Sequence, residues 1–146
     1  MAVRSEKRRF GFDDSIFAAA LLLAAAGSAQ ALDLTVEVIS PRPDQGKVNA
    51  ALFADETSWM KNALAEQRIP AAGKTVLVYR NLAPGSYALS VFQDLNGNAK
   101  LDTNVVGLPT EPYGFSRDAA GVMGPPAFSA AALALSADTT ITITLR

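Results

Sequence analysis

The stretch that decides the fold is TITITL at residues 140–145, close to the C-terminus. Its apolar members, Ile141, Ile143 and Leu145, alternate strictly with threonines. Successive side chains of an extended chain point to opposite faces, so this pattern predicts a strand with one buried and one wet face. Such alternation is typical of antiparallel sheets, which commonly pack one face on the core and leave the other solvated.

The same alternation recurs upstream of this strand. It is present in residues 34–38, 48–53, 75–82 and 87–92. The sequence NLAPG at 81–85 lies between the last two, where Pro84 fixes φ and Gly85 permits a turn, so we expect a hairpin there. Seven or so short strands, with no internal repeat, predict an all-β chain: a single antiparallel β-sandwich of immunoglobulin-like or transthyretin-like architecture.

One segment departs from the strand pattern. Residues 56–65 carry Trp59, Ala63 and Leu64 at helical spacing, with Thr57 or Ser58 as the candidate N-cap. This spacing predicts one short helix over about 56–65 that closes over the edge of the sheets. We expect Trp59 to anchor that helix in the core rather than to serve as a platform for a ligand.

The N-terminus has the pattern of an export signal. A basic start at residues 4–9 precedes an uncharged apolar run at 16–26, and Ala29-Gln30-Ala31 forms an A-x-A cleavage site. This order predicts a signal peptide over 1–31, a β-sandwich domain over 32–146 and a periplasmic or secreted protein. The run is about half the roughly 20 residues that cross a bilayer, so we expect no transmembrane segment after processing. An N-terminal buried helix or an uncleaved anchor is the alternative.

Composition excludes several classes of function. The chain has 146 residues and contains neither histidine nor cysteine. Catalytic triads that use histidine, zinc held by histidine or cysteine, and disulfides are therefore excluded. Lys and Arg total 13 against 14 Asp and Glu, for a net charge of −1, which argues against a nucleic-acid partner.

The loop DLNGNAKLDTN at 94–104 carries the candidate metal ligands. Short oxygen-bearing side chains alternate along it, and they fit calcium, which takes six to eight oxygen ligands in flexible geometry. The candidate donors are the side chains of Asp94, Asn96, Asn98 and Asp102 with the carbonyl of Lys100.

This loop departs from an EF-hand in two ways. Ala99 stands where that motif has glycine, and Val105 stands where it has a bidentate acid. We therefore expect a weak calcium site, with a dissociation constant of about 10⁻⁴–10⁻³ M. The alternative is a polar β-turn in which Asn and Asp side chains bond to their own backbone.

A second distinctive loop follows at 107–116, GLPTEPYGFS. Its prolines and glycines predict a rigid loop, on which Glu111, Tyr113 and Phe115 are candidates for a ligand or partner surface. The alternative is that the two aromatic side chains fix the loop onto the sandwich. Glu111 is also a candidate for completing the metal shell.

Three segments together point to a family. The sequences NLAPGSYA at 81–88, VFQDLNGNAKLDTN at 91–104 and GLPTEPYGFS at 107–116 resemble the bacterial exported family called domain of unknown function 2141 (DUF2141). The resemblance implies a small secreted or periplasmic β-sandwich and no assigned activity. Two departures stand out: Gln93 replaces a histidine common in the family, and residues 129–132 lack its acidic patch.

These features favour an exported, non-enzymatic module that binds an unidentified protein or envelope ligand through the loops of 94–116, with calcium as an ordering ion. One alternative is a metal-assisted or carboxylate-dependent hydrolase that uses Asp94, Asp102 and Glu111. Another is a purely structural envelope subunit that packs through its free sheet edges.

Overall fold

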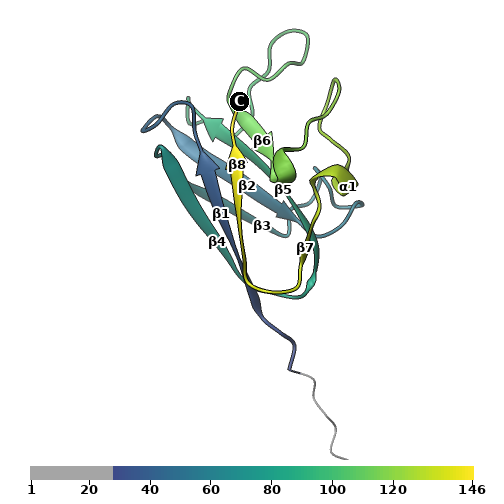
Figure 1. The fold of residues 1–146 in the computed structure, drawn as a ribbon. Coiled ribbons are helices and arrows are strands. Elements are labelled where there is room, and N and C mark those ends of the chain that lie inside the picture. The colour runs from purple at the N-terminus through teal and green to yellow at the C-terminus, as the bar shows by residue number, and fades with distance from the viewer. Residues whose placement is uncertain (1–27) are drawn as a thin grey trace, which may run out of the picture.

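The computed structural model describes residues 28–146, which form two β-sheets packed face to face (Figure 1). The basic start and apolar run of the predicted signal peptide lie outside the described residues. Within 28–146, no helix is long and apolar enough to cross a membrane. The prediction of an all-β sandwich is confirmed.

The first sheet has three strands in the order β4-β1-β8. Its members are β1 (Leu32–Ile39), β4 (Lys74–Leu82) and β8 (Thr139–Thr144). β1 is antiparallel to β4 and parallel to β8, with Val36 opposite both Leu77 and Ile141. Among the strand pairs of residues 28–146, this parallel pair departs from the antiparallel pairing that the alternation predicts.

The second sheet has five strands, with β3-β2-β5-β6 in order and β7 paired to β5. They are β2 (Lys47–Phe53), β3 (Ala65–Pro70), β5 (Gly85–Asp94), β6 (Tyr113–Phe115) and β7 (Leu133–Leu135). The predicted NLAPG turn joins β4 to β5, but the prediction of a hairpin is wrong, because these two strands lie in different sheets and do not pair.

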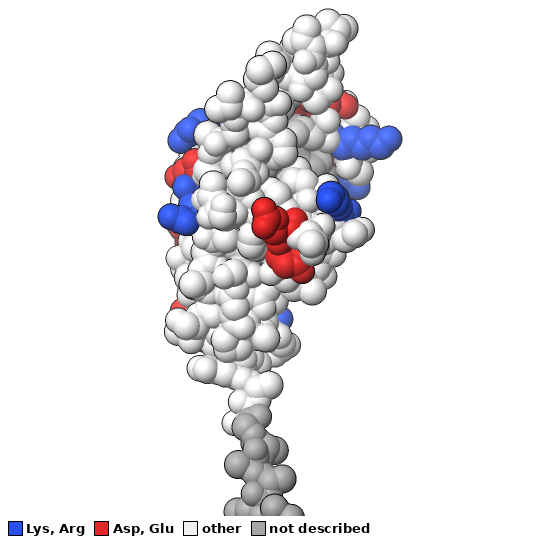
Figure 2. All heavy atoms as spheres, turned by 90° about the vertical axis from the view of Figure 1, so that its right-hand side faces the viewer, with Lys and Arg blue, Asp and Glu red and all other residues white. Residues whose placement is uncertain are grey.

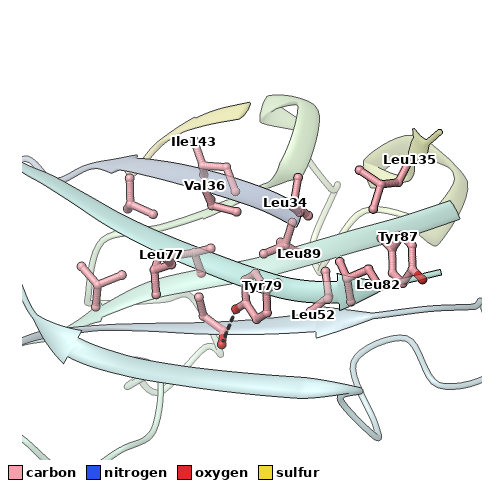
Figure 3. Packing of buried hydrophobic residues seen from close by; sticks show 14 of the residues in the cluster. Leu34, Val36, Leu52, Leu77, Tyr79, Leu82, Tyr87, Leu89, Leu135 and Ile143 are labelled. Atoms are coloured by element: carbon pink, nitrogen blue, oxygen red, sulfur yellow. Dashed lines mark hydrogen bonds between the residues drawn. The ribbon is translucent and has the colours of Figure 1, made fainter. Parts of the chain in front are cut away.

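The core lies between the sheets and is built from the apolar members of the alternating strands (Figure 3). In β1 the burial pattern alternates along its whole length, and Leu34, Val36 and Val38 are fully buried. Tyr79 donates its hydroxyl to the Ala50 carbonyl at 3.1 Å, a bond that joins the two sheets inside the core. Burial is the main reason that the pKa of Tyr79 is raised far above its ordinary value, with the Glu66 carboxylate adding to it.

Hydrogen bonds join the two sheets at both lateral edges of the sandwich. Gln67 on β3 donates to the Val78 carbonyl on β4 at 2.8 Å. On the other side, Tyr113 and Arg146 exchange two backbone hydrogen bonds, each of 3.0 Å. These bonds occupy backbone groups that an open sheet edge would offer to another chain.

The prediction of a helix over 56–65 is wrong. Residues 56–61 form consecutive turns, 62–64 are irregular and Ala65 begins β3; the short α1 helix lies at Phe128–Ala131 instead. Asp55 accepts hydrogen bonds from the Thr57 hydroxyl and the Ser58 backbone N–H, both at 2.7 Å. The bond from the Ser58 N–H is one that can cap a helix, but Met60 adopts a positive φ of 58°, which ends any helical run.

Trp59 is nevertheless the core anchor that the sequence predicts, because only 9% of its surface is exposed. Its ring centroid lies 5.0 Å from that of Phe53 and 5.9 Å from that of Phe128. Its indole N–H donates to the Pro126 carbonyl at 2.8 Å. This second apolar cluster covers one end of the outer face of the five-stranded sheet.

We expect Trp59→Ala to lower the free energy of unfolding by about 3–5 kcal/mol, since it removes the largest ring of the second cluster and leaves a cavity there. Urea titration followed by circular dichroism measures the loss. The matched control is Met60→Ala next to it, an exposed position where a change within about 0.5 kcal/mol is expected. Equal effects of the two substitutions would contradict the anchoring role.

Candidate functional site

Two buried carboxylates hold the loop between β5 and β6 against the sandwich. The first is Asp94, the last residue of β5, whose surface is 0% exposed. Its Oδ1 accepts the Gly97 backbone N–H, and its Oδ2 accepts the Ala99 backbone N–H, both at 2.8 Å. Oδ2 also pairs with the Arg68 guanidinium of β3 at 2.8 Å. One side chain thus joins the loop, its own strand and the sheet edge.

These bonds set the charge state of Asp94. Burial by itself raises the pKa of the carboxyl. The hydrogen bonds from the Ala99 N–H, Arg68 and the Gly97 N–H outweigh burial, so the pKa lies below the ordinary 3.8. Asp94 is therefore an anion whose oxygens are already occupied by donors from this chain.

The second buried carboxylate belongs to Glu111, which is 6% exposed. Its two oxygens accept the backbone N–H groups of Leu95, at 2.8 Å, and of Asp102, at 3.0 Å. Glu111 does reach back to the 94–102 segment, as the sequence suggests. Its partners there are backbone N–H groups, so it serves as a clamp between the two ends of that segment.

The remaining predicted metal ligands lie at the surface of the same turn. The side-chain amides of Asn96 and Asn98 both donate to the Asp102 carboxylate. Their side-chain oxygens accept the backbone N–H groups of Asn98 and Lys100, at 3.1 and 3.0 Å. Within residues 28–146, no group of three or more His, Cys, Asp or Glu residues is placed to hold a metal ion.

The predicted calcium set is thus divided between two environments. Asp94 faces inward onto Arg68, whereas Asn96, Asn98 and Asp102 converge with one another outside. The bonds that Asp94, Asn96 and Asn98 accept from backbone N–H groups are the kind that a polar turn makes with its own backbone. Sequence spacing could not decide between a cation and the chain's own N–H groups as partners of these oxygens, because every residue type other than proline carries a backbone N–H.

The three predicted surface residues do not form one exposed surface. Glu111 and Phe115 are each 6% exposed, and only Tyr113, at 38%, reaches solvent. The Phe115 ring packs 6.0 Å from Trp59 and thereby fixes the loop onto the sandwich. Tyr113 packs against Phe115 at the same centroid distance of 6.0 Å.

Apolar loop tips are the feature that the sequence reasoning missed. Val105 and Val106 on one loop are 103% and 73% exposed, and Val122 and Met123 on another are 93% and 99% exposed. Both loops project from the same end of the molecule as the C-terminus (Figure 1). On the face shown in Figure 2, the uppermost projection carries no charged side chain. The sequence does contain a pattern that could have predicted these tips, namely an apolar pair next to glycine in a polar loop. Val105-Val106 precedes Gly107, and Val122-Met123 lies between Gly121 and Gly124.

Two packed sheets with elaborate loops gathered at one end define the chain as a small β-sandwich protein. Residues 36–143 match the model of the family DUF2141, described as an uncharacterized protein conserved in bacteria. The chain belongs to this family, which confirms the resemblance seen in its loop motifs. No curated protein matches the chain, and no solved structure does.

The lowered pKa of Asp94 predicts how stability depends on pH. The unfolded chain binds the proton more readily than the folded one, so the contribution of Asp94 is complete above its ordinary pKa of 3.8. That contribution is lost as the pH falls through the lower folded-state pKa. We expect Asp94→Asn to reduce the acid-induced fall in the free energy of unfolding, measured by urea titration at several pH values.

The comparison variant is Asp55→Asn. The Thr57 hydroxyl is the main cause that lowers the pKa of Asp55, but this carboxylate is exposed, so solvent screens it and we expect a smaller change in the profile. A pH profile of Asp94→Asn that equals that of the wild type would refute the assignment.

Proposed function

We propose that this protein is an exported, non-enzymatic binding module of the bacterial envelope, and that it binds its partner through the loop end of the sandwich. The observation that carries the proposal is the set of exposed apolar side chains on the two projecting loops. It includes Val105, Val106, Leu108, Val122 and Met123, which we call the apolar tip.

Physical chemistry supports a binding role for the apolar tip. Water disfavours exposed apolar surface, and clustered exposed apolar residues commonly mark interaction sites. The loop that carries Val105 and Val106 is fastened by the buried carboxylates of Asp94 and Glu111. A rigid loop loses little conformational entropy on binding, which favours affinity.

The arrangement of carboxylates favours binding over hydrolysis. A hydrolase of this kind needs at least two carboxylates facing a substrate. Asp94 and Glu111 instead face backbone N–H groups of their own loop. The bonds between Gln67 and Val78 and between Tyr113 and Arg146 likewise favour the loops over the sheet edges as the contact surface.

Export rests on the sequence pattern of residues 1–31, so the proposed location is the periplasm or the exterior of the cell. At the loop end, the expected partner is an envelope protein or ligand with an apolar surface. β1 enters the sandwich at the opposite end from the projecting loops, so the N-terminus left by cleavage after Ala31 would lie away from the apolar tip (Figure 1).

Site-specific photo-cross-linking tests the proposal. A photoreactive residue at Val106 or Val122 is expected to give the same dominant cross-linked species in an envelope extract. The matched control is Val76 on β4, which is 49% exposed but lies away from the loops. Replacement of the other apolar-tip residues by serine should abolish the product. Equal labelling from Val76, or no defined product from the loops, would refute the apolar tip as the contact surface.

Calcium binding belongs to the same proposal, because the oxygen-bearing side chains of Asn96 and Asn98 already converge on Asp102. Rotation of the two amides would turn their oxygens toward a cation beside that carboxylate. Occupancy at 100 times the dissociation constant stabilises a protein by about 2.7 kcal/mol. For a domain of this size, we expect the melting temperature to rise by about 10 °C in calcium and less in magnesium.

Two variants complete the calcium experiment. Asp102→Ala should lose the calcium-dependent shift, whereas Asp44→Ala, on a different exposed loop, should keep it. If calcium causes no shift in the wild type, the 94–102 segment is a turn held by its hydrogen bonds alone.

A further inference from the structure

A cleft of about 360 Å³ lies on the outer face of the five-stranded sheet, and none of the apolar-tip residues lines it. Its floor comes from two cross-strand rows of outward-facing side chains. One row runs from Arg68 on β3 through Asn49 on β2 to Phe92 on β5. The next row places Ala51 opposite Glu66 on one side and Ser90 on the other. The volume lies within the range of small-molecule sites.

Small residues in the centre of the sheet make this face hollow. Ala51 and Ser90 are short, whereas the longer side chains of Arg68, Glu66 and Phe92 stand around them. At one end Ala51 packs against the Trp59 cluster, and at the other end Ala99 of the 94–102 loop forms a wall. Ala99 holds a positive φ of 65°, a conformation that is costly for alanine and is fixed by the bond from its N–H to Asp94.

Some of the polar groups around the cleft lack a hydrogen-bond partner. The side-chain oxygen of Asn49 is buried and accepts no hydrogen bond. A buried acceptor without a donor is costly, so rotation of this amide toward a donor in the cleft would be favourable. One guanidinium nitrogen of Arg68 donates a hydrogen bond to the Asp94 carboxylate. Ser90 and Glu66 complete a lining that contains both donors and acceptors.

We infer that this cleft is a binding site for a neutral, hydroxyl-rich ligand, and that its chemical class is a saccharide. Hydroxyl groups donate and accept at once, which suits the mixed lining of Asn49, Ser90 and Glu66. The carbon–hydrogen face of a sugar ring is apolar and suits the half-buried ring of Phe92 together with the methyl groups of Ala51 and Ala99.

Other ligand classes fit the lining less well. An anion would meet the Glu66 carboxylate, and the guanidinium of Arg68 is already neutralised by Asp94. In the cleft lining a cation would find one carboxylate, that of Glu66, because the Asp94 oxygens are occupied by Arg68 and by backbone N–H groups. An extended peptide gains its affinity from backbone pairing at a sheet edge, but β2 at the centre of the cleft is already paired on both sides, with β3 and β5. The inference is independent of the proposed partner at the apolar tip, since it concerns a different face.

Nuclear magnetic resonance titration of the ¹⁵N-labelled full-length protein tests the inference. The probes are N,N′-diacetylchitobiose, maltose and cellobiose, with inorganic phosphate and tetra-alanine as the charged and peptide comparisons. At least one saccharide is expected to give saturable shifts at Asn49, Ala51, Ser90 and Phe92, with a dissociation constant of about 1 mM. Phosphate and tetra-alanine are expected to give none.

Two variants assign the shifts to the cleft. Ala51→Leu fills its centre, and Asn49→Leu removes the amide while preserving its approximate size, so each should abolish the response to saccharide. The matched control is Thr35→Leu, on the outer face of the three-stranded sheet, which should respond as the wild type does. The inference is overturned by an absence of saturable shifts with all three saccharides, by a response that survives in both cleft variants, or by stronger binding of phosphate or tetra-alanine.

Discussion

The carboxylate of Asp94 is the interaction on which the rest of the loop end depends. It lies at the end of β5, fully out of solvent, and must be paired because a buried unpaired charge is very costly. Its partners come from two directions: the Arg68 guanidinium from β3, and the backbone N–H groups of Gly97 and Ala99 from the loop. Glu111 fastens the same loop from its far side through Leu95 and Asp102.

Both surfaces described above are built on this arrangement. The loop that Asp94 and Glu111 hold continues into the stretch that presents Val105 and Val106. The same bonds place Ala99 at the wall of the cleft and hold Arg68 at its rim. A change at Asp94 is therefore expected to reach both surfaces, although they face different directions and would bind different partners.

The strands could be predicted because a strand with one buried face has apolar residues at every second position. Val36 and Ile143 are such residues, and both are fully buried. The turns at 56–64 could not be predicted, since Trp59, Ala63 and Leu64 fit a helix equally well and the positive φ of Met60, which ends the helical run, appears only in three dimensions. The candidate loop was found from its Asn and Asp residues. The inward orientation of Asp94 and Glu111 could not be predicted, because their partners are backbone N–H groups and a distant arginine.

Amide hydrogen exchange tests most directly whether the two carboxylates fasten the loop. In the wild type, the N–H groups of Leu95, Gly97, Ala99 and Asp102 should be protected although they lie in a loop. Asp94→Asn should release Gly97 and Ala99, and Glu111→Gln should release Leu95 and Asp102, while β1 and β2 keep their protection. Unchanged exchange at these four amides in the variants, or no protection there in the wild type, would contradict the account.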